Sequence, residues 1–211
     1  MSLVVSLGAV DQELVERVLG SNHTLVQEPS DADLAVAVGA IVRASVTVDR
    51  AMLDRMPRLR VLARTGVGTE RVDLVAATDR GIPVVVTPGS NTNAVAEGAL
   101  ALALHILKQI RPLTDLVREG NWDQRGRFPL GDIEGSTVGI IGYGRIGRRL
   151  ASIVTAMGAK VIAYDPIADI PKDQRAATVD DLLKVSNIVS LHAPLTDDNH
   201  HMLNRESIAL L

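Results

Sequence analysis

Cysteine is absent from the 211 residues of this chain, and aromatic residues make up only 2% of it. Without cysteine there can be no disulfide. Hydrophobic residues still account for 46% of the chain, which is enough for a packed core. That core must consist mainly of valine, leucine, isoleucine and alanine, because the aromatic side chains are only Trp122, Phe128, Tyr143 and Tyr164.

An excess of positive charge is also missing, since the formal net charge is -3 at pH 7. The chain therefore lacks the basic field that attracts nucleic acids and anionic lipids. Its longest apolar run, residues 99–104, is too short to cross a bilayer, and its N-terminus has neither a basic leader nor a cleavage site. We expect a soluble, cytoplasmic protein that binds neither nucleic acids nor membranes.

The most informative stretch is TVGIIGYGRIGRRLASIVTAMGAKVIAYD, residues 137–165. Its apolar pattern predicts a buried strand over 138–141, a helix over 145–157 and a second strand over 160–164. The turn between the first strand and the helix has the pattern G-x-G-x-x-G, formed by Gly142, Gly144 and Gly147.

Each glycine of this turn has a physical role if a dinucleotide binds here. Gly142 permits a tight turn, Gly144 lets the backbone approach a pyrophosphate, and Gly147 lets the helix pack closely on its strand. The helix N-terminus then offers free N–H groups to the phosphates. Asp165 lies 23 residues after Gly142, where an acid can bind the ribose hydroxyls and repel the 2′-phosphate of NADP. The pattern predicts an NAD site, with an ordinary strand–helix–strand unit as the alternative.

The first 92 residues alternate strand-like and helix-like segments, which predicts a parallel sheet with helices on both faces. We expect strands at 3–7, 34–38, 59–63 and 84–86, and helices at 12–19, 49–55 and 72–80. These segments form one small α/β domain, residues 1–92. Residues 93–211 then begin with a long helix and continue into the unit that carries the glycine turn.

Ligands of such sheets bind beyond the carboxyl ends of the strands. Arg43 follows the apolar pair Ile41-Val42, and Arg64 stands directly before the loop Thr65-Gly66-Val67-Gly68. Glycine N–H groups beside arginine side chains suit a carboxylate or a phosphate. The alternative is that both arginines are solvated strand ends, which periodicity alone favours.

Apolar side chains surround nearly the whole predicted helix at 93–110. This pattern is typical of a helix in an interior, between two domains or at a subunit interface, and we expect His105 to lie in the core. Pro112 is expected to interrupt the helix, with residues 113–119 continuing it.

A short helix is predicted at 179–185 and a further strand at 187–191, followed directly by His192. With no carboxylate close in sequence, His192 is interpreted as a pocket wall or a structural histidine rather than a catalytic residue. The adjacent His200 and His201 are interpreted as solvated, so no metal site is expected.

The last residues, 205–211, have the pattern of a helix without a C-terminal cap. In the usual strand order of a dinucleotide-binding sheet, the strand at 138–141 needs a neighbour that would follow this helix. Without it, an apolar central strand would be a bare edge. We therefore expect the chain to be a fragment of a longer protein.

Several motifs in this order resemble the NAD-dependent D-2-hydroxyacid dehydrogenases, above all their D-3-phosphoglycerate dehydrogenase branch. They are RTGVGTERVD at 64–73, RGIPVVVTPGSNTNAVAEGALALAL at 80–104, VGIIGYGRIG at 138–147, YDP at 164–166 and HAPLTDDNHHMLN at 192–204. The resemblance implies an α/β fold with a flavodoxin-like substrate domain and a Rossmann NAD-binding domain, and a homodimer built largely through the latter. The implied activity is oxidation of a D-2-hydroxy acid with NAD, with 3-phosphoglycerate as the first candidate substrate.

The resemblance also implies roles by position. The cofactor-binding residues are Gly142, Tyr143, Gly144, Arg145, Ile146, Gly147, Asp165, His192, Ala193 and Pro194, and the substrate-binding residues are Arg43, Arg64, Val67, Gly68 and Asn91. The family's catalytic arginine, carboxylate and histidine come later than Leu211, as does a helix that completes its first domain, so no catalytic residue is assigned. The open alternative is a dehydrogenase-like NAD sensor or corepressor that binds NAD without turnover.

Overall fold

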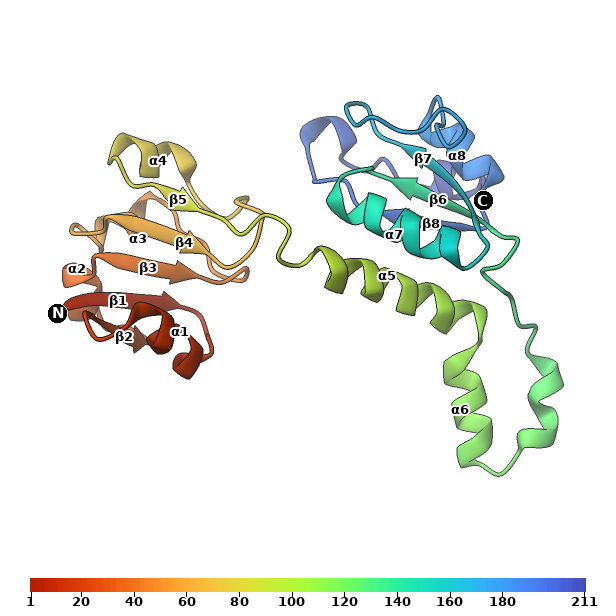
Figure 1. Ribbon diagram of the computed structural model, residues 1–211, viewed down its shortest axis with the longest axis horizontal. Helices are drawn as coiled ribbons and strands as arrows, with labels where there is room; N and C mark the ends of the chain where they lie inside the picture. Colours follow the sequence, from red (N-terminus) through yellow and green to blue (C-terminus); the bar gives the residue numbers. More distant parts are fainter. The chain divides into compact units, whose positions relative to one another are not determined.

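The structure is a computed structural model that describes residues 1–211, and it divides into two compact units, Met1–Asn91 and Thr92–Leu211. Each unit is built on its own parallel sheet (Figure 1). None of the helices combines the length and the apolar character needed to span a bilayer.

The first unit contains five parallel strands in the order β2-β1-β3-β4-β5, which is the flavodoxin-like order and confirms the expected fold class. The strands are β1 (Ser2–Leu7), β2 (His23–Gln27), β3 (Gly39–Val42), β4 (Val61–Arg64) and β5 (Val84–Val85). The helices are α1 (Gln12–Leu19), α2 (Asp31–Val36), α3 (Arg50–Asp54) and α4 (Leu74–Asp79). Because crossovers between parallel strands are right-handed, α1 covers one face and the other three helices cover the opposite face.

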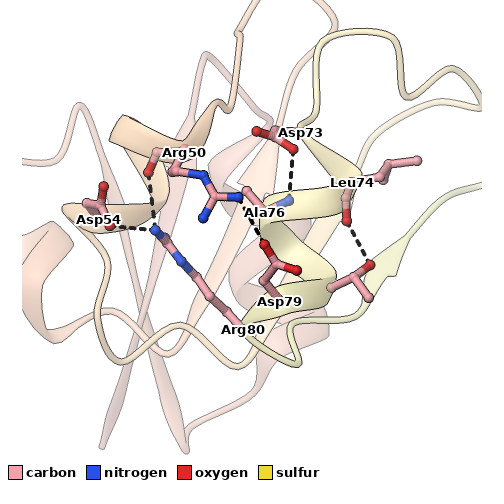
Figure 2. A network of polar contacts seen from close by, with 8 residues as sticks. Arg50, Asp54, Asp73, Leu74, Ala76, Asp79 and Arg80 are labelled. Carbon is pink, nitrogen blue, oxygen red and sulfur yellow. Dashed lines mark hydrogen bonds and ion pairs between the residues drawn. The ribbon is translucent and has the colours of Figure 1, made fainter.

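The core of this unit lies under α2, α3 and α4. Leu34 of α2, Leu53 of α3 and Leu62 of β4 are almost completely buried together. On the surface above this core, Arg50 of α3 forms an ion pair with Asp79 of α4 at 2.9 Å (Figure 2). Exposed pairs of this kind add little stability, so the apolar core holds the two helices on the sheet.

Two sequence-based expectations for this unit are wrong. The apolar run 34–38 is not a strand, because most of it belongs to α2, which begins at a capping box formed by Ser30 and Asp33. The strand follows at β3 instead. Strand β2 was not expected because it lies at the edge of the sheet, where only Leu25 is buried and no apolar run is needed.

The second unit contains three parallel strands in the order β7-β6-β8. These are β6 (Thr137–Ile141), β7 (Lys160–Tyr164) and β8 (Ile188–Leu191). Helix α7 (Arg145–Ala156) covers one face with α5 (Thr92–Leu107) packed against it, and α8 (Val179–Val185) covers the other face. Strand β6 therefore lies between two layers of helix, and its last four residues are buried.

The expectation that β6 would be a bare edge is wrong. Strand β8 pairs with β6 in parallel register, from Val138 opposite Ile188 to Ile141 opposite Leu191. It takes the side of β6 that faces away from β7, which sequence spacing alone does not specify. The final helix, α9 (Arg205–Ile208), is also shorter than expected.

The break after α5 differs from the expectation as well. The helix ends at Leu107, and Gln109 adopts a left-handed conformation with φ of 48° before α6 (Ile110–Arg118) begins. Pro112 lies in the first turn of α6, where a missing N–H costs little. His105 is exposed rather than part of a core. A short 3₁₀ segment, η1 (Trp122–Arg127), follows α6, and the chain returns to α5 through a bond from Gly131 N to Leu107 O of 2.9 Å.

Candidate functional site

The turn between β6 and α7 has room for glycine alone at two of its three glycine positions. Gly142 has φ of +92°, and a Cβ built there would lie 2.5 Å from the Ala193 nitrogen. A Cβ at Gly147 would lie 2.1 Å from the carbonyl oxygen of Gly142, so α7 packs directly on the turn. No atom lies within 4 Å of a Cβ built at Gly144, which leaves that side of the backbone open to a ligand.

The N-terminus of α7 is free of any side-chain cap. Its N-cap residue is Gly144, and the first bond of the helix runs from Arg148 N to Gly144 O at 3.0 Å. The amides of Arg145, Ile146 and Gly147 therefore have no partner within the helix. Free amides at the positive end of a helix dipole bind phosphate groups. The turn thus fits the pyrophosphate of a dinucleotide.

Asp165 follows β7 and is half-buried beside the turn. Its Oδ2 accepts a hydrogen bond from Tyr143 N at 2.7 Å, and its Oδ1 accepts bonds from Ile167 N at 2.9 Å and Ala168 N at 2.8 Å. Burial tends to raise the pKa of this carboxyl, but the three amide bonds and the nearby Arg148 outweigh it and hold the pKa below its ordinary value. A carboxylate has about four acceptor positions, so room remains on Oδ2 for one ribose hydroxyl.

Tyr143 differs from the other residues of the turn because its side chain is buried and bonded within the protein. Its side chain is only 7% exposed, its hydroxyl donates to Gln174 Oε1 at 3.1 Å, and its amide donates to Asp165. Neither its ring nor its amide is free to bind a ligand. The sequence analysis predicts Tyr143 as a cofactor-binding residue. In the structure its contacts with Asp165 and Gln174 stabilise the turn.

The loop after β8 lies against the glycine turn through its backbone. His192 N donates to Ile141 O at 2.7 Å, and the His192–Ala193 peptide fills the space beside Gly142. The carbonyl of Pro194 accepts a bond from Asn199 Nδ2 at 2.6 Å, which holds the end of the loop.

The imidazole of His192 has surroundings of its own. It makes a 2.9 Å hydrogen bond with Ser190 Oγ and borders an apolar groove of about 510 Å³ between α5 and β8. Burial lowers the pKa of His192, which favours the neutral ring. A neutral imidazole paired with a hydroxyl and not with a carboxylate fits the structural interpretation of this histidine.

Three loops at the carboxyl end of the first sheet are joined to one another. Arg43, after β3, reaches Thr65 Oγ1 at 3.5 Å, and Arg64, at the end of β4, donates to Thr65 O at 2.9 Å. The loop after β5 joins them through a bond from Thr87 N to Gly66 O of 3.0 Å. The structure therefore brings both arginines of the sequence prediction to one loop.

The remaining predicted substrate residues lie on the same loops. Val67 is exposed, and Asn91 is the exposed last residue of the first unit. A Cβ at Gly68 would lie 2.3 Å from Glu70 Oε2, so this glycine makes room for a carboxylate that the sequence reasoning did not consider.

Arg148 and Gln174 were also missed in the sequence. Gln174 carries no pattern that could identify it. The sequence does contain a pattern that could have identified Arg148. Three arginines, Arg145, Arg148 and Arg149, lie in the first turns of α7, where the helix dipole disfavours cations. A basic residue in such a place indicates a specific partner.

Comparison with known proteins gives consistent matches. Residues 100–211 match a family described as "D-isomer specific 2-hydroxyacid dehydrogenase, NAD binding domain". The chain is 39% identical over 216 residues to a D-3-phosphoglycerate dehydrogenase of Mycobacterium leprae and 37% identical over 172 residues to a hydroxypyruvate reductase of Thermotoga maritima. These matches cover 99% and 80% of this chain but only 39% and 55% of the length of the two relatives.

A solved structure gives the same result. The D-lactate dehydrogenase of Aquifex aeolicus, determined with NAD and lactic acid, superimposes with a TM-score of 0.87 at 29% identity. The superposition covers 100% of this chain and 66% of that one.

Proposed function

Since this chain belongs to the D-isomer specific 2-hydroxyacid dehydrogenase family, we propose that the protein is an enzyme that transfers a hydride between NAD and a D-2-hydroxy acid. Residues 100–211 match the NAD-binding domain of that family. The observation that carries the proposal is the uncapped N-terminus of α7 behind the glycine turn, with Asp165 beside it. NAD, when bound, supplies the acceptor for the hydride of the hydroxy acid.

Each part of the cofactor has a partner on this chain in the proposal. The amides of Arg145 and Ile146 bind the pyrophosphate, which approaches over Gly144. The free acceptor position of Asp165 binds a ribose hydroxyl, and its negative charge repels a 2′-phosphate. The backbone of His192 to Pro194 forms a wall beside the turn.

The substrate in the proposal is a small acid with more than one anionic group, such as 3-phosphoglycerate. Arg43 and Arg64 supply two positive charges at one loop, and guanidinium groups bind carboxylates and phosphates well. Val67 and Gly68 offer backbone N–H groups, and Asn91 offers a side-chain amide. The similarity to the phosphoglycerate dehydrogenase of M. leprae supports this choice among the hydroxy acids.

We further propose that the protein is a cytoplasmic homodimer that contacts its copy through the segment from α5 to residue 131. Large apolar side chains are exposed along this segment, with Leu102 68% and Ile106 67% exposed on α5. Others on the segment are Val117, Trp122 and Leu130. Sedimentation at several protein concentrations tests this proposal, and a monomer at all of them would contradict it.

The cofactor claim is tested by titrating this chain with NADH and with NADPH. Fluorescence should show binding of NADH and much weaker binding of NADPH. Substitution Asp165→Ala should weaken NADH binding by about 1 to 3 kcal/mol, because hydrogen bonds at a half-buried site are lost. An unchanged affinity would mean that the ribose lies elsewhere.

The activity is tested on the natural protein at its full length. Formation of NADH from NAD should be followed with a panel of D-2-hydroxy acids that includes 3-phosphoglycerate, with the L-isomers as controls. Binding of NAD without turnover of any acid would instead favour the sensor or corepressor.

A further inference from the structure

Arg148 reaches back from α7 to the glycine turn and makes three contacts there. Its Nε donates to the carbonyl oxygen of Tyr143 at 2.9 Å, and its guanidinium carbon lies 5.5 Å from the centre of the Tyr143 ring. Its Nη2 donates to Asp169 O at 3.3 Å, on the loop that follows Asp165. One side chain therefore joins the turn, the helix and the loop after β7.

The Tyr143–Gly144 peptide is the group that Arg148 holds. A peptide is planar and trans, so its C=O and N–H point in opposite directions. Because the Tyr143 oxygen faces Arg148, the Gly144 N–H must point away from Arg148. The Gly144 N–H donates to no group of the protein, and a Cβ built at Gly144 would have no atom within 4 Å, so this N–H remains available to a ligand.

Tyr143 is anchored on its other sides as well. The preceding peptide is fixed by the bond from Tyr143 N to Asp165, and the hydroxyl is fixed by the bond to Gln174. Gln174 in turn is tied to β7, since its carbonyl oxygen accepts a bond from Ala163 N at 2.6 Å. The only contact that orients the Tyr143 carbonyl from the side of α7 is that of Arg148.

We infer that Arg148 is a positioning residue of the NAD site, which orients the Gly144 N–H toward the pyrophosphate by holding the Tyr143 carbonyl and ring. It acts through the backbone and does not touch the cofactor. This inference rests on the proposed NAD site and adds to it a residue outside the glycine pattern.

The test compares Arg148→Met and Arg148→Lys with the wild type in NADH titrations. Lysine keeps the charge but loses the planar fork that donates and stacks at the same time. Both substitutions should weaken NADH about tenfold, the effect of one lost hydrogen bond to a charged group. Recovery of wild-type affinity in Arg148→Lys would show that charge alone matters and would overturn the inference.

Arg149→Met is the matched control. Arg149 is the next residue of α7, is exposed, and donates to Asn93 Oδ1 at 2.9 Å on α5 rather than to the turn. Its removal should leave NADH affinity unchanged. An equal loss in Arg149→Met and Arg148→Met would mean that any arginine on α7 contributes through charge, against the inference.

NMR order parameters of the ligand-free protein give a readout that does not depend on NAD. The order parameter of the Gly144 N–H should be lower in Arg148→Met than in the wild type, because its peptide plane is no longer held, while amides of β6 keep their values. An unchanged order parameter at Gly144 would overturn the inference even where NAD binds. Failure of the wild type to bind NADH would instead count against the proposed function.

If Arg148→Met does not fold, Gln174→Leu can be used in its place. This substitution removes the bond that holds the Tyr143 hydroxyl and should also weaken NADH binding. Unchanged NADH affinity in Gln174→Leu would contradict the inference that the anchoring of Tyr143 positions the turn.

Discussion

The two units differ in how the helices that follow their strands begin. Every such helix of the first unit has a side-chain cap, and the caps of α1, α2, α3 and α4 are Asp11, Ser30, Asp49 and Asp73. In the second unit α8 is capped by Thr178, but α7 begins at Gly144 with no cap. The amides that are bonded to a cap side chain in those helices are therefore free at the start of α7.

This difference separates two kinds of parallel-sheet loop. In the first unit these helix ends already have side-chain caps, so the proposed anion site there relies on arginine side chains and on amides of the loops. In the second unit the free amides of α7 are themselves the proposed anion site, and leaving them without a side-chain cap costs about 1 kcal/mol of stability. A missing cap after a buried strand therefore indicates a phosphate site more directly than the count of glycines.

The largest expected effect comes from closing the space between the turn and α7. Substitution Gly147→Ala places a Cβ against the Gly142 carbonyl, and neither backbone atom can move without separating α7 from β6. We expect a loss of about 3 kcal/mol in the free energy of unfolding. Urea denaturation measures it, with Gly144→Ala as the control, and equal losses in both variants would contradict the packing argument.

The next effect depends on pH. Since the pKa of Asp165 is lowered in the folded state, the stability from its bonds is complete above its ordinary value of 3.8 and is lost as the pH falls through the folded pKa. The difference in unfolding free energy between the wild type and Asp165→Asn should therefore shrink on acidification. Asp173→Asn controls for the loss of one charge. A difference that grows on acidification would contradict the prediction.

The third prediction concerns Gly144→Asp, a substitution that gives α7 a side-chain cap like those of the first unit. Gly144 has φ of -76° and ψ of -157°, which aspartate adopts readily, so the carboxylate of Gly144→Asp can accept from the free amides. We expect NADH to bind at least about tenfold more weakly, equivalent to about 1.4 kcal/mol, with no loss of thermal stability. Calorimetry and melting curves together test this, and NADH affinity equal to that of Gly144→Ala would contradict it.

The smallest effect is expected in the first unit. Asp73 caps α4 by accepting from Ala76 N at 2.8 Å (Figure 2), so Asp73→Ala should lower the free energy of unfolding by about 1 kcal/mol. NADH affinity should not change. Asp79→Ala, which breaks the exposed pair with Arg50, should cost less, about 0.5 kcal/mol. A larger loss from Asp79→Ala than from Asp73→Ala would reverse the expected order.

Local patterns predicted the elements that are strongly amphipathic or clearly bounded. The bounds of α1, β7 and α8 agree with the expected 12–19, 160–164 and 179–185. The fold class and the family were also correct, because strand-like and helix-like segments alternate along the chain and several motifs follow one another in the order typical of the family. Strand β2 and the lateral position of β8 were not predictable in this way, since an edge strand needs few apolar residues and spacing does not specify which side of β6 a strand takes.

The candidate site was predicted as a set of contacts with a ligand, but much of it consists of contacts within the protein. Tyr143 and Asp165 were both predicted to bind the cofactor, and in the structure they are bonded to each other, while Asp165 also binds backbone amides of its own loop. Arg148 contacts Tyr143 only because its side chain reaches back from α7 to the turn. Such contacts depend on the three-dimensional path of the backbone and have no signature in residue spacing.

The bonds of Asp165 have a consequence for how cofactor preference can change during evolution or engineering. The carboxylate that would exclude NADP also fastens the loop of Ile167 and Ala168 and the amide of Tyr143. Replacing it with a residue that accepts a 2′-phosphate therefore releases three backbone amides at the same time. A switch to NADP needs compensating changes in the loop first, so cofactor preference at this position is protected by the architecture of the turn.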